Sequence, residues 1–286
     1  MRGGGRAAGG RYCAVLGAPI AHSLSPVLHR AAYAALGLDG WEYRAVECDE
    51  AALPGLIEGL DGSWAGLSLT MPLKRAVLPL LDDVSELAVV VGGANTVTFP
   101  DGRRRGDNTD VAGIVAALAE AGAPAPRSAV VLGAGATAAS TLAALRELGV
   151  GDVTVLARDL RRTEDLRSAA ERLGMAPRLA PLDDIKDHLD GDLLVSTLPS
   201  GAADAVAPLL PAAPPRVVFD VVYAPWPTAL GTAAAEAGAA VVGGLPMLVH
   251  QAARQVELMT GTDRLPPAAV AAMRAAGEAE LSRRRG

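Results

Sequence analysis

The sequence has little of what marks several common classes of protein. Two cysteines, Cys13 and Cys48, are too few for a disulfide framework and lack metal-ligand spacing. Four scattered histidines predict no metal site. The net charge of -6 provides no basic surface for nucleic acid. No apolar run approaches the roughly 20 residues of a membrane span. No signal peptide is evident either, so we expect a cytoplasmic protein whose first residues form a frayed tail.

Aromatic residues are also scarce, at 3% of the chain, whereas 50% of the residues are hydrophobic and are mostly Ala, Val and Leu. Such a chain forms its core by aliphatic packing between helices and strands. At 286 residues it is long for one core and sufficient for two domains.

Strand-like and helix-like segments alternate along the chain. In the first part, the patterns predict strands at residues 12–16, 41–46, 64–69 and 94–99 and helices at 25–36, 53–60 and 111–121. After a hinge-like stretch at 123–127, they predict strands at 129–132, 153–157, 193–196, 217–222 and 240–242 and helices at 137–148, 162–173, 246–260 and from 267 onward. Such alternation predicts an α/β fold with an N-terminal α/β unit, followed by a doubly wound parallel sheet covered on both faces.

Lysine is rare in a chain that has 24 arginines and two lysines, Lys74 and Lys186. Lys74 ends the uncharged run 66–73, and a lysine ammonium can release its proton where a guanidinium cannot. Asp110 is a candidate carboxylate partner that would favour the charged ammonium. We interpret the two as an acid–base pair and leave open which of them moves the proton. The alternatives are a surface lysine and a carboxylate that caps the helix at 111–121; Ser25, before Pro26, is likewise predicted to be an N-cap.

A glycine-rich segment at 133–138 directly follows the strand predicted at 129–132 and opens a helix. Two glycines allow a tight turn and a close approach of the backbone to a pyrophosphate, and a small third residue allows helix–strand packing. The predicted dinucleotide-binding residues are Gly133, Ala134, Gly135, Ala136 and Ala138. Because the proton-transfer groups precede this loop, the order suggests a hydride-transferring enzyme.

The end of the strand at 153–157 bears on the choice of nicotinamide cofactor. Sites for NAD usually carry an acidic residue there, whereas guanidinium groups suit the 2′-phosphate of NADP. Arg158 and Arg161 follow this strand and favour NADP, although both fit ordinary solvated charges. Asp159 fits a ribose instead, so NAD is the alternative.

Seven segments, in one order, resemble those of shikimate dehydrogenases, and the resemblance covers about residues 12–262. The segments are 19–26, 66–74, 92–96, 108–110, 133–138, 222–230 and 244–251. The resemblance implies reversible, NADP-dependent reduction of 3-dehydroshikimate to shikimate, in aromatic amino-acid biosynthesis. It also implies a substrate-binding and catalytic domain over residues 1–110, completed by helices in 245–286. Residues 111–244 would form a Rossmann-type dinucleotide-binding domain, with the active site in the cleft between the two.

The family's site residues carry over to matching positions. The resemblance implies that Ser23, Ser25 and Tyr223 hold the substrate carboxylate. It implies that Lys74 and Asp110 are catalytic, that the ring hydroxyls are bound by these two with Asn95 and Gln251, and that Thr70 lies nearby. Gly244 and Met247 would lie on the cofactor side.

The sequence departs from the family pattern in two places and leaves the substrate open. Ser68 replaces the usual Asn, and we expect this shorter side chain to reach a substrate hydroxyl through water. Residues 157–159 replace the usual Asn-Arg-Thr of the cofactor segment. Paired serines at 23 and 25 fit shikimate; a quinate or aminoshikimate dehydrogenase and a non-catalytic ligand-sensing protein are the alternatives, whereas a folate-linked dehydrogenase fits poorly. We expect a small-molecule substrate and a monomer or homodimer.

Overall fold

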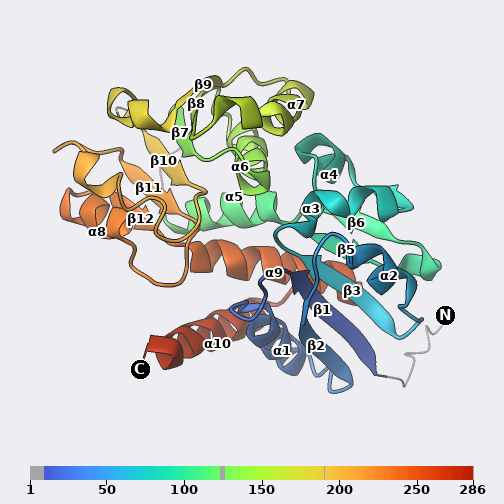
Figure 1. Cartoon of the computed structure of the whole chain (residues 1–286). Helices are drawn as coiled ribbons and strands as arrows, with labels where there is room; N and C mark the ends of the chain where they lie inside the picture. The colour runs from blue at the N-terminus through green and yellow to red at the C-terminus, as the bar shows by residue number, and fades with distance from the viewer. Residues whose placement is uncertain (1–9, 123–125, 190, 286) are drawn as a thin grey trace.

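A computed structural model describes residues 10–122, 126–189 and 191–285. These residues form two six-stranded sheets, and helices α5 (Asp110–Glu120) and α9 (Gly244–Thr260) lie side by side between them (Figure 1). The predicted N-terminal tail lies almost wholly outside the described residues, as do residues 123–125 of the predicted hinge-like stretch.

The first sheet is mixed. Its spatial order is β2 (Trp41–Glu47), β1 (Arg11–Gly17), β3 (Trp64–Leu69), β5 (Thr96–Thr98), β6 (Arg105–Asp107) and β4 (Asp83–Val84). β1 is parallel to β2 and β3, whereas β5 is antiparallel to β3 and β6. The carboxyl ends of β1 and β3 therefore meet at one edge, and the chain leaves this edge toward the segments that carry Ser23 and Lys74.

The second sheet is parallel throughout. Its order is β12 (Ala240–Val242), β11 (Val217–Asp220), β10 (Leu193–Ser196), β7 (Ser128–Leu132), β8 (Asp152–Ala157) and β9 (Arg178–Pro181). The order reverses between β7 and β10, which is the switch point where doubly wound sheets bind ligands. The predicted doubly wound parallel sheet is confirmed.

Helices cover both faces of each sheet. The α-helices of the first part are α1 (Ser25–Ala35), α2 (Leu53–Glu58), α3 (Leu73–Ala76), α4 (Glu86–Val91) and α5. Those of the second part are α6 (Ala136–Glu147), α7 (Glu164–Arg172), α8 (Ala229–Glu236), α9 and α10 (Pro267–Arg285). Short 3-10 turns are η1 (Leu78–Leu80), η2 (Pro100–Gly102), η3 (Leu160–Arg162), η4 (Leu182–His188) and η5 (Ala207–Leu209). The C-terminal α9 and α10 pack on α1, so the end of the chain returns to the first sheet (Figure 1).

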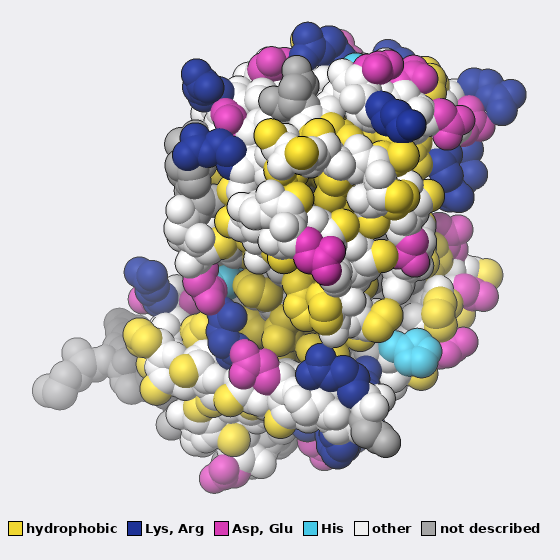
Figure 2. All heavy atoms as spheres, turned by 90° about the vertical axis from the view of Figure 1, so that its left-hand side faces the viewer, with side chains coloured by type: hydrophobic (Ala, Val, Ile, Leu, Met, Phe, Trp, Pro, Cys, Tyr) yellow, Lys and Arg dark blue, Asp and Glu magenta, His cyan; other side chains and the backbone are white. Residues whose placement is uncertain are grey.

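Four apolar clusters form the core, one on each face of each sheet. Aliphatic side chains such as Val131, Leu142 and Ile114 dominate the cluster between the second sheet and α5 and α6, as the scarcity of aromatic residues predicts. The exception is the cluster under α1, where Tyr33, Tyr43 and His29 form T-shaped, stacked and tilted ring contacts. Figure 2 shows the face that lies on the left in Figure 1, where apolar side chains line a hollow between the upper and lower parts.

Most predicted elements are confirmed, but short ones were missed. β4, β6 and β9 have two to four residues, too few to establish a periodicity. The short helix α4 was also not predicted; Ser85 Oγ accepts a hydrogen bond from Ala88 N at its start, and Gly92 at φ 76° ends it. No helix of the described residues is long and apolar enough to span a membrane.

Candidate active site

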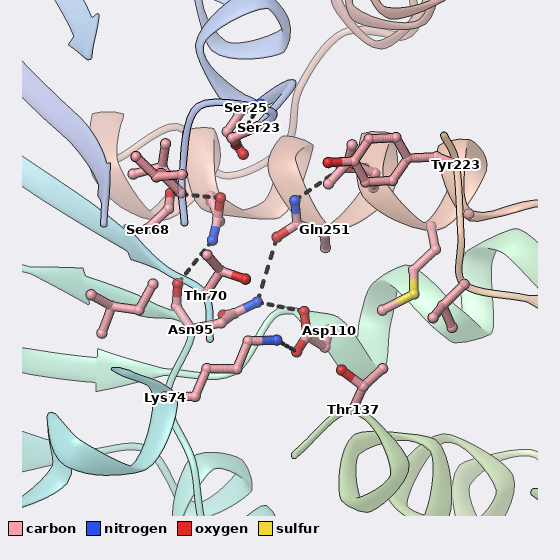
Figure 3. A pocket seen from close by; sticks show the side chains of 18 of the residues that line it. Ser23, Ser25, Ser68, Thr70, Lys74, Asn95, Asp110, Thr137, Tyr223 and Gln251 are labelled. Atoms are coloured by element: carbon pink, nitrogen blue, oxygen red, sulfur yellow. Dashed lines mark hydrogen bonds and ion pairs between the residues drawn. The ribbon is translucent and has the colours of Figure 1, made fainter. Parts of the chain in front are cut away.

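A cavity of about 290 Å³ lies between the two sheets and is lined by both parts of the chain. Every residue predicted to bind substrate or to catalyse lines it: Ser23, Ser25, Thr70, Lys74, Asn95, Asp110, Tyr223 and Gln251. Figure 3 shows these side chains converging from α9, the first sheet and the segments around them. The tertiary structure thus brings together residues that are up to 228 positions apart, from Ser23 to Gln251 (251 − 23).

Lys74 and Asp110 form an ion pair on one side of the cavity. Lys74 Nζ lies 2.5 Å from Asp110 Oδ2, and the exposed fractions of the two side chains are 15% and 6%. Lys74 belongs to α3, which directly follows β3, and Asp110 is the first residue of α5. The N-cap of α5 is Thr109, whose side chain makes no capping hydrogen bond, and the carboxylate of Asp110 accepts from the side chains of Lys74 and Asn95. The alternative that Asp110 caps this helix is therefore excluded, and its carboxylate faces the cavity.

The side-chain amide of Asn95 donates a hydrogen bond to the second carboxylate oxygen of Asp110. Asn95 Nδ2 donates to Asp110 Oδ1 over 2.8 Å and lies 3.4 Å from Gln251 Oε1. Asn95 Oδ1 accepts from the backbone N–H of Thr109 over 2.8 Å, and a backbone N–H can only donate, so the orientation of the amide is fixed. Both carboxylate oxygens of Asp110 therefore accept hydrogen bonds, one from Lys74 and one from Asn95.

Ser23, Ser25 and Tyr223 lie on the other side of the cavity from Lys74 (Figure 3). Ser23 Oγ accepts a hydrogen bond from the backbone N–H of Ser25 over 3.2 Å. Ser25 is the first residue of α1, while Leu24 is the N-cap and makes no capping bond with its side chain. The prediction that Ser25 caps this helix was wrong, because Leu24 is the N-cap and Ser23 Oγ, two positions before Ser25, accepts from the Ser25 N–H.

Tyr223 follows β11 and is partly buried. Burial raises the pKa of its phenol, and the nearby Arg284 guanidinium offsets part of that rise. Arg284 also donates to the backbone carbonyl of His22 over 2.8 Å, so the last turn of α10 links the two loops that carry Tyr223 and the serines. The phenol therefore stays protonated near neutral pH and can donate a hydrogen bond.

Sequence reasoning missed three residues of the cavity region. Gln255 lines the cavity and lies one helical turn after Gln251, so the i, i+4 spacing on α9 was an available signal. Thr137, in the first turn of α6, also lines it. Tyr43 is fully buried and donates to Ser68 Oγ, and nothing in its strand pattern pointed to the site.

The predicted glycine-rich loop joins β7 to α6 at the switch point of the second sheet. Gly133 has φ 104°, and a Cβ there would lie 2.6 Å from Thr197 Oγ1, so both the backbone conformation and the available space require glycine. Gly135 is the N-cap of α6, which leaves the first N–H groups of that helix open to an anion. Ala138 has no exposed surface, which fits a small third residue.

Arg158 and Arg161 follow β8 but differ in their surroundings. Arg161 Nε and Nη2 each lie 3.0 Å from a carboxylate oxygen of Asp159, which also accepts from the backbone N–H of Arg161. Among the described residues, Arg158 is exposed and has no carboxylate partner. Of the two guanidiniums, that of Arg158 is therefore the free one.

Gly244 and Met247 border the cavity where α9 begins. A Cβ at Gly244 would collide with the backbone carbonyl of Val221, so this close approach requires glycine. These two residues and Thr137 connect the polar part of the cavity to the second sheet. The other predicted cofactor residues, 133–136, 138, 158 and 161, are outside the cavity lining.

Comparison with known proteins places the chain in a family. A family model described as "Shikimate dehydrogenase substrate binding domain" matches residues 15–97, and one described as "Shikimate 5'-dehydrogenase C-terminal domain" matches residues 244–276. The chain is 41% identical over 251 residues to a shikimate dehydrogenase (NADP(+)) of Thermus thermophilus, covering 87% of this chain and 92% of that protein. The chain belongs to the shikimate dehydrogenase family.

Solved structures of shikimate dehydrogenases share the whole fold. The crystal structure of the Mycobacterium tuberculosis enzyme has a TM-score of 0.85 and 43% identity, covering 94% of this chain and 99% of that one. A Thermus thermophilus shikimate 5-dehydrogenase in complex with NADP(H) and shikimate has a TM-score of 0.81 and 36% identity, covering 94% and 99%. The two matched family regions contain Lys74, Asn95 and Gln251, whereas Asp110 and Tyr223 lie outside them and reach the cavity through the fold.

Proposed function

We propose that this protein catalyses the reversible, NADPH-dependent reduction of 3-dehydroshikimate to shikimate. The observation that carries the proposal is the Lys74–Asp110 pair in a cavity that also reaches the first turn of α6 at Thr137. The proposed acid–base pair and the N-terminus of α6, which suits a dinucleotide phosphate, therefore border the same cavity. The relatives named above are shikimate dehydrogenases, and one was solved with both NADP(H) and shikimate.

Lys74 would donate the hydrogen bond and the proton to the ketone oxygen. Negative charge develops on that oxygen during reduction, so a charged donor within hydrogen-bond reach lowers the barrier. A lysine ammonium has three N–H donors, and one of them is used by Asp110, so two remain for a ligand. Asp110 already accepts from Lys74 and Asn95, so we assign it the role of holding the ammonium in place rather than of contacting the ketone.

The remaining polar residues would orient the substrate across the cavity. Ser23, Ser25 and Tyr223 can donate hydroxyl hydrogen bonds to a carboxylate, and a carboxylate is favoured near the N-terminus of α1. Asn95, Gln251 and Thr70 lie between these residues and Lys74, where they would meet the ring hydroxyls. With these roles, the carboxylate and the reacting carbon of the substrate would lie at opposite ends of one small ligand.

The residues of the second sheet fit NADP. Gly133 and Gly135 leave room for a pyrophosphate at α6, and the free guanidinium of Arg158 suits a 2′-phosphate. When bound there, NADP supplies or accepts the hydride. Arg161 is engaged by Asp159 and would contribute less to that phosphate, and Gly244 and Met247 would border the nicotinamide side of the cavity.

The proposal extends to domain organisation and setting. Residues 1–110, completed by 245–286, would form the substrate domain, and 111–244 the cofactor domain; the separate sheets and the packing of α10 on α1 support this division. The free, buried thiols of Cys13 and Cys48 suit the reducing cytoplasm. We infer that the enzyme works as a monomer or a homodimer, which size-exclusion chromatography with light scattering would determine.

An absorbance assay tests the reaction. Purified protein is incubated with shikimate, quinate or an aminoshikimate, each with NADP or NAD, and the reduced-nicotinamide band is followed. Shikimate with NADP should give the highest kcat/KM. Faster turnover of quinate would assign the protein to a different substrate, and binding of shikimate without turnover would favour a ligand sensor.

A further inference from the structure

Ser68 is a cavity residue whose hydroxyl is held from two sides by buried neighbours. Tyr43 Oη donates to Ser68 Oγ over 2.6 Å, and Ser68 Oγ donates to Gln255 Oε1 over 2.8 Å. The exposed fractions of Tyr43, Ser68 and Gln255 are 0%, 3% and 2%. The three side chains come from β2, β3 and α9, so only the folded chain assembles this row.

The direction of the hydrogen bonds in this row is fixed by the backbone. Gln255 Nε2 donates to the backbone carbonyl of Asn95 over 3.0 Å and to Thr96 Oγ1 over 3.1 Å. A carbonyl oxygen can only accept, so the amide nitrogen of Gln255 must face Asn95 and its oxygen must face Ser68. Ser68 therefore gives its single proton to Gln255, and Tyr43 is the donor in its bond with Ser68.

A serine hydroxyl has one proton and two lone pairs. In Ser68 the proton and one lone pair are occupied, so one lone pair is left for a ligand. We propose that Gln255 is a positioning residue that fixes the polarity of Ser68, so that this wall of the cavity accepts a hydrogen bond from a ligand hydroxyl and does not donate one. The inference rests on the proposed function, because it assigns the recognition of a ring hydroxyl of shikimate that does not react.

Lys74 and Ser68 offer opposite hydrogen-bonding groups to a ligand, and this contrast restricts which substituents the cavity can bind. Lys74 has only N–H groups to offer, whereas Ser68 has only a lone pair to offer. A ring hydroxyl that meets Ser68 must therefore point its proton toward β3. A substituent that accepts hydrogen bonds but cannot donate them would place its own lone pair against that of Ser68 and form no hydrogen bond there.

Fluorinated analogues test this polarity, because a carbon-bound fluorine accepts weakly and cannot donate. The measurement is kcat/KM for shikimate and for analogues in which one non-reacting ring hydroxyl is replaced by fluorine. In the unaltered enzyme, one of these analogues should be used about 10-fold less well than shikimate, the effect of losing one hydrogen bond to a buried acceptor. In Gln255→Met, which keeps the side-chain length but removes the amide, Ser68 can turn its proton into the cavity. The ratio of kcat/KM for shikimate to kcat/KM for that analogue, here called the fluorine penalty, should then shrink by about threefold or more.

Tyr43→Phe is the matched control. It removes the hydroxyl that donates to Ser68 but keeps a ring to stack on His29, and Ser68 still donates to Gln255. The fluorine penalty should stay within about twofold of the unaltered enzyme, because the polarity of Ser68 is unchanged. A merely structural role of Gln255 would lower kcat/KM for shikimate and for the analogue alike and would leave their ratio unchanged.

Ser68→Ala provides a second test if Gln255→Met does not fold, as judged by circular dichroism. Loss of the serine oxygen removes the acceptor, so the fluorine penalty should fall here as well. An unchanged penalty in folded Gln255→Met, an unchanged penalty in Ser68→Ala, or an equal fall in Tyr43→Phe would each overturn the inference, while shikimate turnover by the unaltered enzyme upholds the proposed function. An unaltered enzyme that does not oxidise shikimate would refute both.

Discussion

The two sides of the cleft are built in different ways. On the substrate side, Asp110, Asn95, Ser68 and Gln255 are all below 5% exposed and bond to one another or to Lys74 and the backbone. On the cofactor side, the groups predicted to bind are backbone N–H groups at α6 and the exposed arginine Arg158.

This difference indicates two strategies of recognition. The substrate side has its donors and acceptors oriented before any ligand arrives, so little ordering remains to be done on binding. The cofactor side offers an exposed charged side chain and open backbone N–H groups. Salt screens the contribution of the charge, and the exposed side chain must be ordered on binding. Changes on the substrate side should therefore affect the chemical step strongly, and changes on the cofactor side should affect cofactor binding moderately.

The largest effect is expected for Lys74→Met. Removal of the charged donor should lower kcat about 1,000-fold or more, while NADPH binding measured by fluorescence stays within a few-fold. The chain offers a natural control in its second lysine, since Lys186 is exposed on η4 and Lys186→Met should retain the full rate. If Lys74→Met kept a rate near that of the unaltered enzyme, the lysine would have no part in the mechanism, and the contrast between the two sides would disappear.

A smaller effect is expected from the interior of the substrate side. His29 is fully buried, stacks on Tyr43 at 3.9 Å between ring centroids, and bonds through Nδ1 to the Ser25 carbonyl. Burial lowers the pKa of His29 from 6.5 to about 4. The neutral ring is favoured in the folded state, so its contribution to stability is present above about pH 6.5 and is lost as the pH falls toward 4.

Urea unfolding at two pH values measures this contribution. Between pH 7 and pH 5, His29 should reduce the free energy of unfolding by about 2 kcal/mol. His29→Phe should lose correspondingly less over the same interval, whatever its stability at pH 7, and His188→Gln on η4 should lose as much as the unaltered protein. Equal losses in His29→Phe and the unaltered protein would show that this part of the substrate side does not depend on a neutral imidazole.

The smallest effects are expected on the cofactor side, where two neighbouring arginines form a matched pair. Arg158→Ala should raise KM for NADP about 10-fold, with little change in KM for NAD, and the effect should diminish at high salt. Arg161→Ala should change KM for NADP about twofold or less, because Asp159 already engages that guanidinium. Steady-state kinetics with both cofactors at two salt concentrations would check this, and equal effects of the two substitutions would contradict the assignment of Arg158.

Sequence patterns predicted the long elements and the local motifs well. The strands that became β3, β10 and β12 have the predicted bounds, because buried runs of apolar residues flanked by turns are legible without tertiary information. The short strands β4, β6 and β9 were missed, since their pairing partners stabilise them rather than their own sequence. The apolar helix α4 was missed for the related reason that a short apolar run suits either state.

The helix starts at Ser25 and Asp110 show where local propensity misled. Both residues are good N-caps in isolation, yet each lies one position inside its helix and faces the cavity. The reason is that Ser23 Oγ binds the N–H of Ser25, and Asn108 Oδ1 binds the N–H of Asp110, so residues two positions back satisfy these groups. Neither contact is evident from propensity alone.

The sequence by itself determined the doubly wound sheet, the glycine turn at Gly133 and the residue types available for chemistry. These features depend on local periodicity and on steric limits that single residues impose. The tertiary structure alone decided that Lys74 meets Asp110 and that Gln255 orients Ser68, because hydrogen-bond direction follows from which fixed backbone group each side chain reaches.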